Sequence, residues 1–353
     1  MIVFRVDGSV EIGAGHVMRC LTLAKELKKQ GHDVRFISRK AIGDMIELVE
    51  SEGFIVYSLE YVENGLWKYI EEKWEEDAKA TINVLINTCV ELLIVDHYSI
   101  DEKWENTLRS YVEKIMVIDD LANRKHSCDI LLDQNYYLNF ENRYTGLVNN
   151  NAKLLLGPKY ALLREEFRTR FNKKSTTIDG NLKNILIFLG GADPTNETYR
   201  ILKSIKPIVE QCNLYIKVVV GLQNPNIYII KQFCEGHSDR FELLIQVNNI
   251  AELICESDLV IGAAGVASLE RIYLVTPSIV ISIAENQIQN AIDLESRKLL
   301  VYVGDKSQQY EKKLQKLLLS FINDTDKLTQ ISKQCSEHKR LWGHEESWIN
   351  SLL

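Results

Sequence analysis

The sequence predicts an α/β protein with two open parallel sheets in tandem, facing each other across a cleft. Three observations carry this prediction. The expected strands are apolar throughout and alternate with helical segments, which is typical of parallel sheets covered on both faces. The pattern pauses once, at residues 167–184, and then restarts. The chain of 353 residues also exceeds what a single ordinary core accommodates.

The first half of the chain alternates β-rich and helical stretches. Gly31 and Gly53 stand where helix C-caps are expected. Strands are expected at 2–7, 33–38, 55–59, 92–97, 115–120 and 130–135, with helices near 16–30, 43–52 and 66–90.

The second half repeats the pattern after a polar, basic stretch that we interpret as the domain linker. Strands are expected at 185–191, 215–221, 241–247, 258–265 and 277–283. Beyond about residue 323 the chain is charged and helical, with Trp342 and Trp348 as apolar anchors. We therefore expect an N-terminal domain over 1–170, a C-terminal domain over 183–322, and a helical tail over 323–353 that packs across the domain junction.

Composition excludes several classes of function. The net charge of −7 and the pI near 5.7 provide no overall attraction to nucleic acid or to an anionic membrane. The seven cysteines form no CxxC pair, so neither a disulfide framework nor a zinc site is indicated. The N-terminal residues lack the pattern of a secretory signal, and no apolar run approaches a membrane span. We expect a cytoplasmic protein.

In open parallel sheets ligands bind beyond the carboxyl ends of the strands. The first such loop reads IGAGHVMR, in which Gly13 and Gly15 allow close backbone approach to a ligand. His16 falls in the first helical turn, where the helix dipole disfavours the imidazolium and leaves a general base. Arg19 shares its face and could contact a phosphate or orient a carboxylate. The alternative is a plain tight turn in which His16 caps the helix.

The corresponding loop of the second half reads GAAGVASLERI. A helix start at Gly265 and Ser268 could hold a diphosphate, and Glu270 could accept hydrogen bonds from ribose hydroxyls. Close packing, with Glu270 complementing the helix dipole, explains the same residues. The chain contains no GxxxxGK[ST] loop, and Met18 interrupts the GxGxxG dinucleotide pattern. A dehydrogenase is therefore disfavoured.

Other strand ends supply further candidates. Asp96, Asp119 and Asp120 could bind Mg²⁺, but strand-end aspartates more often cap loops, so we expect neither a metal nor a cofactor. The remaining candidates to bind a ligand are Asp7, Tyr98 and Asn135, which could contact a sugar, and Gly191, Gly221 and Gln287, which could contact a nucleotide.

Five ordered blocks resemble a known family. They are RVDGSVEIGAGHVMRCLTLAKEL, LLIVDHYSID, VIDDLANRKHSCDILLDQN, GPKYALLREEF and ILIFLGGADPTN, within roughly residues 1–300. In this order they are similar to the PseG/SpsG family, the nucleotide-sugar hydrolases of pseudaminic acid biosynthesis and their spore-coat-polysaccharide relatives. That family resembles GT-B glycosyltransferases of the MurG-like group, with two Rossmann-like domains.

The resemblance implies removal of UDP from UDP-2,4-diacetamido-2,4,6-trideoxy-β-L-altrose by water, with cleavage of the anomeric C–O bond and no metal. It maps the catalytic histidine to His16, the turn glycines to Gly13 and Gly15, and the donor-site glutamate to Glu270. Gly265 and Ser268 are carried over on the same loop. The tail after about residue 305 is longer than in compact members of the family.

The main alternative is a GT-B glycosyltransferase that uses a UDP-sugar donor for surface or spore-coat polysaccharide. In such an enzyme an acceptor hydroxyl replaces water. We find no clear amphipathic stretch that would hold a lipid-linked acceptor at a membrane, which favours the hydrolase.

Overall fold

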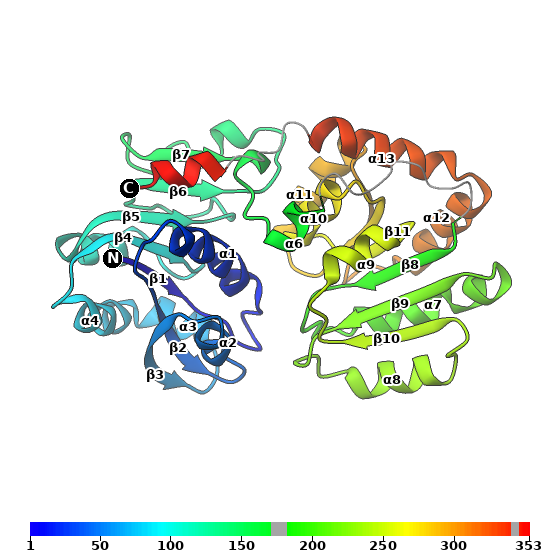
Figure 1. Cartoon of the computed structure of the whole chain (residues 1–353), viewed down its shortest axis with the longest axis horizontal. Coiled ribbons are helices and arrows are strands. Elements are labelled where there is room, and N and C mark those ends of the chain that lie inside the picture. The colour runs from blue at the N-terminus through cyan, green and yellow to red at the C-terminus, as the bar shows by residue number, and fades with distance from the viewer. Residues whose placement is uncertain (171–181, 340–345) are drawn as a thin grey trace. The chain divides into compact units, whose positions relative to one another are not determined.

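The chain divides into two compact units, each built on one parallel sheet (Figure 1). The computed structural model describes residues 1–170, 182–339 and 346–353. The first unit contains Met1–Asn135, Asn139–Leu162 and the described C-terminal residues that end at Leu353. The second contains Tyr136–Leu138 and the described part of Leu163–Trp342. The predicted class, two parallel-sheet α/β domains, is confirmed.

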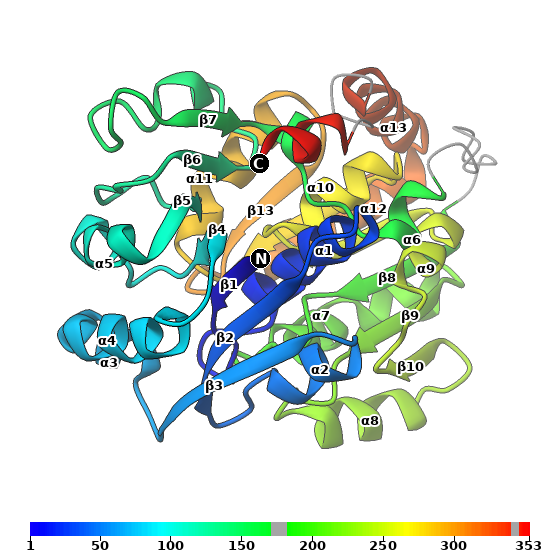
Figure 2. The same ribbon diagram turned by 60° about the vertical axis from the view of Figure 1, so that its left-hand side comes forward.

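In the described residues the first unit has one seven-stranded sheet, in the order β3-β2-β1-β4-β5-β6-β7 (Figure 2). All of its neighbouring strands are parallel. The strand order reverses where β1 pairs with both β2 and β4, which is where open sheets bind ligands. The strands are β1 (Ile2–Val6), β2 (Val34–Ala41), β3 (Ile55–Val62), β4 (Val90–Asp96), β5 (Val112–Ile118), β6 (Ile130–Asp133) and β7 (Lys153–Leu156).

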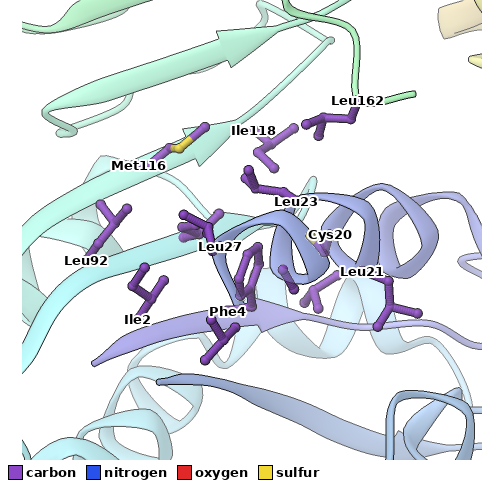
Figure 3. Close-up of a cluster of buried hydrophobic side chains, with 14 of the residues drawn as sticks. Ile2, Phe4, Cys20, Leu21, Leu23, Leu27, Leu92, Met116, Ile118 and Leu162 are labelled. Atoms are coloured by element: carbon purple, nitrogen blue, oxygen red, sulfur yellow. The ribbon is translucent and has the colours of Figure 1, made fainter. Parts of the chain in front are cut away.

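Helix α1 (Gly15–Lys29) packs on one face of this sheet (Figure 3). Because side chains alternate along a strand, every second residue of each central strand points to this face. Ile2 and Phe4 of β1 meet Leu23 and Leu27 of α1 in one fully buried cluster. The cluster also includes Leu92, Ile94, Met116, Ile118, Ile130 and Leu132.

The opposite face is covered by α4 (Trp74–Leu85) and α5 (Glu102–Leu108). It also buries a charge network, in which Asp77 of α4 accepts hydrogen bonds from Arg5, Arg39 and the indole N–H of Trp104. These side chains are almost completely buried, and the pairing compensates the cost of burying their charges. The first unit also contains α2 (Ile46–Ser51) and α3 (Leu66–Glu72).

The second unit contains a sheet with six described parallel strands in the order β10-β9-β8-β11-β12-β13. Its strands are β8 (Asn184–Phe188), β9 (Tyr215–Val220), β10 (Phe241–Ile245), β11 (Leu259–Ala263), β12 (Ser278–Ser282) and β13 (Val301–Asp305). Its helices are α6 (Glu165–Arg168), α7 (Glu197–Gln211), α8 (Ile227–Glu235), α9 (Ile250–Glu256), α10 (Ala267–Tyr273), α11 (Asn286–Ser296), α12 (Glu311–Asn323) and α13 (Asp326–Lys339).

The last described residues return to the first unit. Ile349 and Leu352 join the α1 face of its core, and Trp348 contacts the ring of Tyr160 edge to face, with 5.8 Å between ring centroids. Helix α13 packs instead on α10 in the second unit. The other predicted anchor, Trp342, lies outside the described residues. In the described ranges no helix is both long and apolar enough to cross a membrane.

The elements differ locally from those expected. The helical region expected at 66–90 is two helices, α3 and α4, separated at Lys73. Two short strands, β7 and β13, were not expected. Most of the stretch expected as a linker, residues 171–181, lies outside the described residues, so the linker stays a prediction; α6 ends at Arg168 and β8 begins at Asn184.

Candidate functional site

The loop after β1 forms a tight turn in front of α1. The Gly13 N–H donates to the carbonyl of Ser9 at 2.8 Å, and Gly13 has a φ of +79°, which favours glycine. A Cβ built on Gly13 or Gly15 would meet nothing within 4 Å. The two glycines therefore leave open space beside the first turn of α1, as close approach of a ligand requires.

His16, in that first turn, is held by a carboxylate from the neighbouring strand. Its Nδ1 lies 2.6 Å from Oδ1 of Asp96, the last residue of β4. Burial alone would raise the pKa of Asp96, but the Arg19 guanidinium and His16 outweigh it, so the pKa lies well below its usual range. Nη2 of Arg19 lies 3.2 Å from the same Nδ1, but it donates to Asp96 Oδ1 at 2.6 Å. Because the ionised Asp96 can only accept, the proton of the shorter contact belongs to Nδ1 of the imidazole.

The other ring nitrogen of His16 is available to a ligand. Although the residue is only 7% exposed, Nε2 makes no hydrogen bond to the described residues and is not among their fully enclosed unpaired atoms. With the proton on Nδ1, Nε2 carries the lone pair. The geometry is that of a histidine oriented by a carboxylate and able to accept a proton.

Arg19, one turn along α1, contacts carboxylates. Its Nε and Nη2 donate to the two oxygens of Asp96 at 2.5 and 2.6 Å, and its Nη1 donates to Asp120 at 2.9 Å. Of the two roles expected for Arg19, the structure supports orientation of a carboxylate. The bidentate pair fixes Asp96, and Asp96 in turn fixes His16.

Tyr98 and Asn135 join the same cluster through Asp120. The Tyr98 hydroxyl donates to Asp120 Oδ1 at 2.6 Å, and the Asn135 amide donates to Oδ2 at 3.3 Å. Burial, and then Asp120, raise the pKa of Tyr98, so its hydroxyl stays protonated. The Tyr98 ring also meets the His16 ring edge to face, with centroids 4.5 Å apart.

Trp67, at the start of α3, completes an aromatic group that sequence reasoning missed. Its ring stacks on Tyr98, with centroids 5.3 Å apart and planes 14° apart, and lies 5.8 Å from the His16 ring. Trp67 lies in a stretch predicted to be a polar helix, and neither a motif nor a strand end indicates that it contributes to the site.

Asp7, a predicted sugar-binding residue, is placed apart from this cluster. It is fully buried, and its Oδ1 lies 2.7 Å from Nη1 of Arg5. The same oxygen accepts a hydrogen bond from the backbone N–H of Arg39 at 2.7 Å. His97 Nε2 lies 3.5 Å from Asp7, and burial lowers the pKa of His97 to about 3, so that ring is neutral. Asp7 therefore belongs to the charge network on the α4 side of the sheet.

In the second unit the structure brings Gly191 and Gly221 together. The Gly221 N–H donates to the Gly191 carbonyl at 3.0 Å, and a Cβ on Gly221 would come within 2.6 Å of that oxygen. The close approach of two loops thus explains Gly221 without any ligand.

Gly265 and Gln287 form a second pair. A Cβ on Gly265 would lie 3.2 Å from the Gln287 amide nitrogen, while the amide oxygen of Gln287 accepts the Ile283 N–H at 3.0 Å. Ser268 is fully buried, accepts from Arg271 at 2.9 Å, and its own N–H donates to the Gly265 carbonyl. Its side chain therefore points into the protein.

Glu270 is paired with Arg164. The guanidinium donates twice to Oε1, at 3.0 and 3.1 Å. Burial raises the pKa of Glu270, while Arg164 acts in the opposite direction. Oε2 has no hydrogen-bond partner in the described part of the chain and is not enclosed, so it could accept from a ligand.

The strand-end aspartates considered for magnesium are engaged by arginines. Asp96 and Asp120 bind Arg19, and Asp119 binds Arg124 at 2.7 Å. Within residues 1–170, 182–339 and 346–353, no group of His, Cys, Asp or Glu side chains is arranged to hold a metal ion.

Comparisons with known proteins identify relatives of this chain. Residues 185–344 match the model of the glycosyltransferase family 28 C-terminal domain. The UDP-2,4-diacetamido-2,4,6-trideoxy-β-L-altropyranose hydrolase of Campylobacter jejuni is 30% identical over 272 residues, which cover 76% of this chain and 86% of the hydrolase. The spore coat polysaccharide biosynthesis protein SpsG of Bacillus subtilis is 22% identical over 286 residues, 81% of this chain and 78% of SpsG.

A longer relative is also similar. An uncharacterized protein of Methanocaldococcus jannaschii is 28% identical over 290 residues, 80% of this chain. The match covers 55% of that protein, so the chain spans about half of its length.

Solved structures agree on the fold. MurG of Acinetobacter baumannii has a TM-score of 0.62 at 14% identity, covering 96% of this chain and 94% of MurG. The spinosyn rhamnosyltransferase SpnG has a TM-score of 0.64 at 13% identity, covering 100% of both chains. The fold is therefore that of the GT-B glycosyltransferases.

Asp133, whose carboxylate accepts a hydrogen bond from the backbone N–H of Asn135 at 3.0 Å, gives a testable pH dependence. Burial, and then the charge of Asp120, raise its pKa to about 7, against the pull of Arg143. Asp133 therefore holds a proton in the folded chain that it releases near pH 4 in the unfolded chain, and its contribution to stability should fall as pH rises from about 4 to 7. We expect Asp133→Asn to remove at least about 1 kcal/mol of this fall, as measured by urea unfolding across that range. Parallel pH curves for the two proteins would contradict the prediction.

Proposed function

Since the chain belongs to the family that includes the UDP-2,4-diacetamido-2,4,6-trideoxy-β-L-altropyranose hydrolase of Campylobacter jejuni, we propose that it is a UDP-sugar hydrolase. Its substrate is a UDP-2,4-diacetamido-2,4,6-trideoxy hexose of the altrose type. Water attacks the anomeric carbon, UDP leaves, and the free sugar enters pseudaminic acid or related surface polysaccharide synthesis.

The His16–Asp96 pair carries this proposal. Nδ1–H of His16 donates to the ionised Asp96, so Nε2 is ready to take a proton from water. The resulting hydroxide oxygen forms the new bond to the anomeric carbon as the bond to the diphosphate oxygen breaks. The electron pair of that bond leaves with UDP, and Asp96 stabilises the imidazolium. A direct displacement of this kind inverts the anomeric centre.

The other residues of the cluster position the base and the sugar. Arg19 keeps Asp96 ionised and fixes the position of its carboxylate. We assign this role to Arg19, and no contact with phosphate. Gly13 and Gly15 leave room for the sugar, and Tyr98 and Asn135 present polar groups linked through Asp120. Asp7 is fully buried in its own ion pair, and we assign it no contact with substrate.

The second unit takes the nucleotide in this proposal. Oε2 of Glu270 accepts from the ribose hydroxyls, while Arg164 keeps Oε1 in place. The diphosphate binds at the backbone of Gly265 and the side chain of Gln287, and this assignment is supported by their lying next to each other. Gly191 and Gly221 shape the neighbouring loops, and buried Ser268 supports the loop from inside.

A glycosyltransferase is the second candidate. The match of residues 185–344 to the glycosyltransferase family 28 C-terminal domain favours it. In that reaction an acceptor hydroxyl takes the place of water at Nε2, and the remainder of the site is unchanged. UDP release without an acceptor separates the two functions.

His16→Ala should abolish most of the hydrolysis. With a panel of UDP-sugars and no acceptor, we expect the wild type to release UDP, and the variant to turn over at least about 100-fold more slowly, because one general base contributes on that scale. His32→Ala, just beyond the far end of α1, is the matched control and should retain activity. UDP release by the wild type only after a saccharide or lipid acceptor is added would identify a transferase.

Asp96→Asn should lower kcat by about 10²–10⁴-fold, because an amide can donate to Nδ1 and so stabilise the wrong tautomer of His16. Asp120→Asn is the comparison, since it also removes a partner of Arg19 but does not touch His16. We expect a smaller loss of kcat for Asp120→Asn. Equal losses in steady-state kinetics would contradict orientation of His16 by Asp96.

Glu270→Gln should weaken nucleotide binding and leave the chemistry intact. We expect KM to rise about tenfold with little change in kcat, because a charged hydrogen-bond acceptor contributes about 1.5–3 kcal/mol. Glu256→Gln, an exposed glutamate of α9, is the control. Calorimetric titration with UDP should show the same loss. Unchanged UDP affinity would refute the role of Glu270.

A further inference from the structure

We propose that Trp67 and Tyr98 form an aromatic wall that binds the apolar, methyl-bearing face of the sugar beside His16, and that Trp67 thereby selects deoxy and N-acetylated sugars. The inference rests on the proposed function and deepens it. It starts from three ring contacts: Trp67 stacks on Tyr98, and the His16 ring meets both rings edge to face, with centroids 4.5 Å (Tyr98) and 5.8 Å (Trp67) apart.

The position of Trp67 is fixed by contacts to the two loops that form the site. The N–H of Leu66 donates to Glu11 Oε2 at 3.0 Å, in the loop that leads to Gly13. The Trp67 carbonyl accepts the Ser99 hydroxyl at 2.8 Å, in the loop that follows Tyr98. His97 packs against the indole at 4.7 Å between centroids. Because the two loops hold the backbone at Trp67 and its ring packs against His97 and Tyr98, the indole is a preorganised surface, and little ordering is required when a ligand binds.

Trp67 nevertheless keeps capacity for a ligand. It is half-buried, and among the residues the structure describes its indole N–H makes no hydrogen bond and is not enclosed. A tryptophan N–H usually finds an acceptor when it becomes buried, as it would under a bound ligand. An unused donor on a ring beside a general base fits a ligand with both an apolar face and an acceptor, such as an acetamido carbonyl.

The chemistry of the proposed substrate matches such a surface. A 2,4-diacetamido-2,4,6-trideoxy hexose carries three methyl groups, at C6 and in the two acetamido groups, in place of the hydroxyls of an ordinary hexose. Methyl groups gain from aromatic contact, whereas a hydroxyl placed against the indole would lose hydrogen bonds to water. The wall therefore discriminates between deoxy and fully hydroxylated sugars by desolvation.

The test compares wild type, Trp67→Ala and Trp67→Phe with the UDP-diacetamido-trideoxy sugar, following UDP release. We expect Trp67→Ala to raise KM about 10–200-fold, the range of an apolar contact in a pocket, and Trp67→Phe to restore most of the loss. The inhibition constant of UDP, which lacks the sugar, should stay within about twofold of wild type, since Trp67 touches only the sugar.

Controls separate this role from damage to the fold and from failure of the proposed function. Tyr61→Ala, which removes an exposed aromatic ring of the same unit, should leave KM and the thermal midpoint unchanged. A Trp67→Ala protein with wild-type KM, or one in which KM and the UDP inhibition constant rise together, overturns the proposal. If the wild type releases no UDP without an acceptor, hydrolysis is refuted. Calorimetric binding of the UDP-sugar against UDP, in wild type and Trp67→Ala, then still decides the aromatic wall.

Discussion

The arrangement around His16 depends on one buried carboxylate. Asp96 takes two hydrogen bonds from Arg19 and one from His16, and the two donors lie one turn apart on the same helix. Without Arg19, burial would favour the neutral acid, and a neutral Asp96 would no longer fix the proton on Nδ1. The ion pair between Arg19 and Asp96 thus stabilises the buried charge of Asp96 and also leaves Nε2 of His16 as a proton acceptor. Removing one member of such a pair typically costs about 3–5 kcal/mol, so stability and chemistry are coupled here.

The sequence allowed the fold class to be predicted, because buried parallel strands are continuously apolar and polar residues begin where the strands end. It allowed His16 to be singled out from the glycine turn. It did not identify the partner of His16, because Asp96 lies eighty positions away and becomes a neighbour only through the pairing of β1 with β4, where Val6 is in register with Asp96. Strand order is a tertiary property that a local pattern does not contain.

Glycine positions in the second unit carry less functional information than the sequence implied. Gly221 is required by the approach of the Gly191 carbonyl, and Gly262 by the Phe188 carbonyl, 2.7 Å from where its Cβ would stand. Both glycines are explained by close packing of the backbone. A loop that surrounds a ligand would also require glycine, so the residue type alone does not distinguish packing from ligand binding. Glu270 differs, because Arg164 binds only one of its carboxylate oxygens and the described residues do not enclose the other, which stays accessible to a ligand.

Alternation along the strands explains which strand-end residues reach the site. On the α1 side lie Ile2, Phe4 and Val6 of β1, Leu92 and Ile94 of β4, and Met116 and Ile118 of β5. The same two-residue period brings Asp96, the last residue of β4, and Asp120, two residues past β5, to that side, where His16 and Arg19 contact them. Asp7 follows Val6 in the chain and His97 follows Asp96, so both face the other side of the sheet, where they join the charge network of Arg5.

This alternation can be predicted from the sequence. Applied to the strand ends, it separates Asp7 from the residues around His16. It could not have found Trp67, which reaches the cluster from a helix after β3 and obeys no strand period.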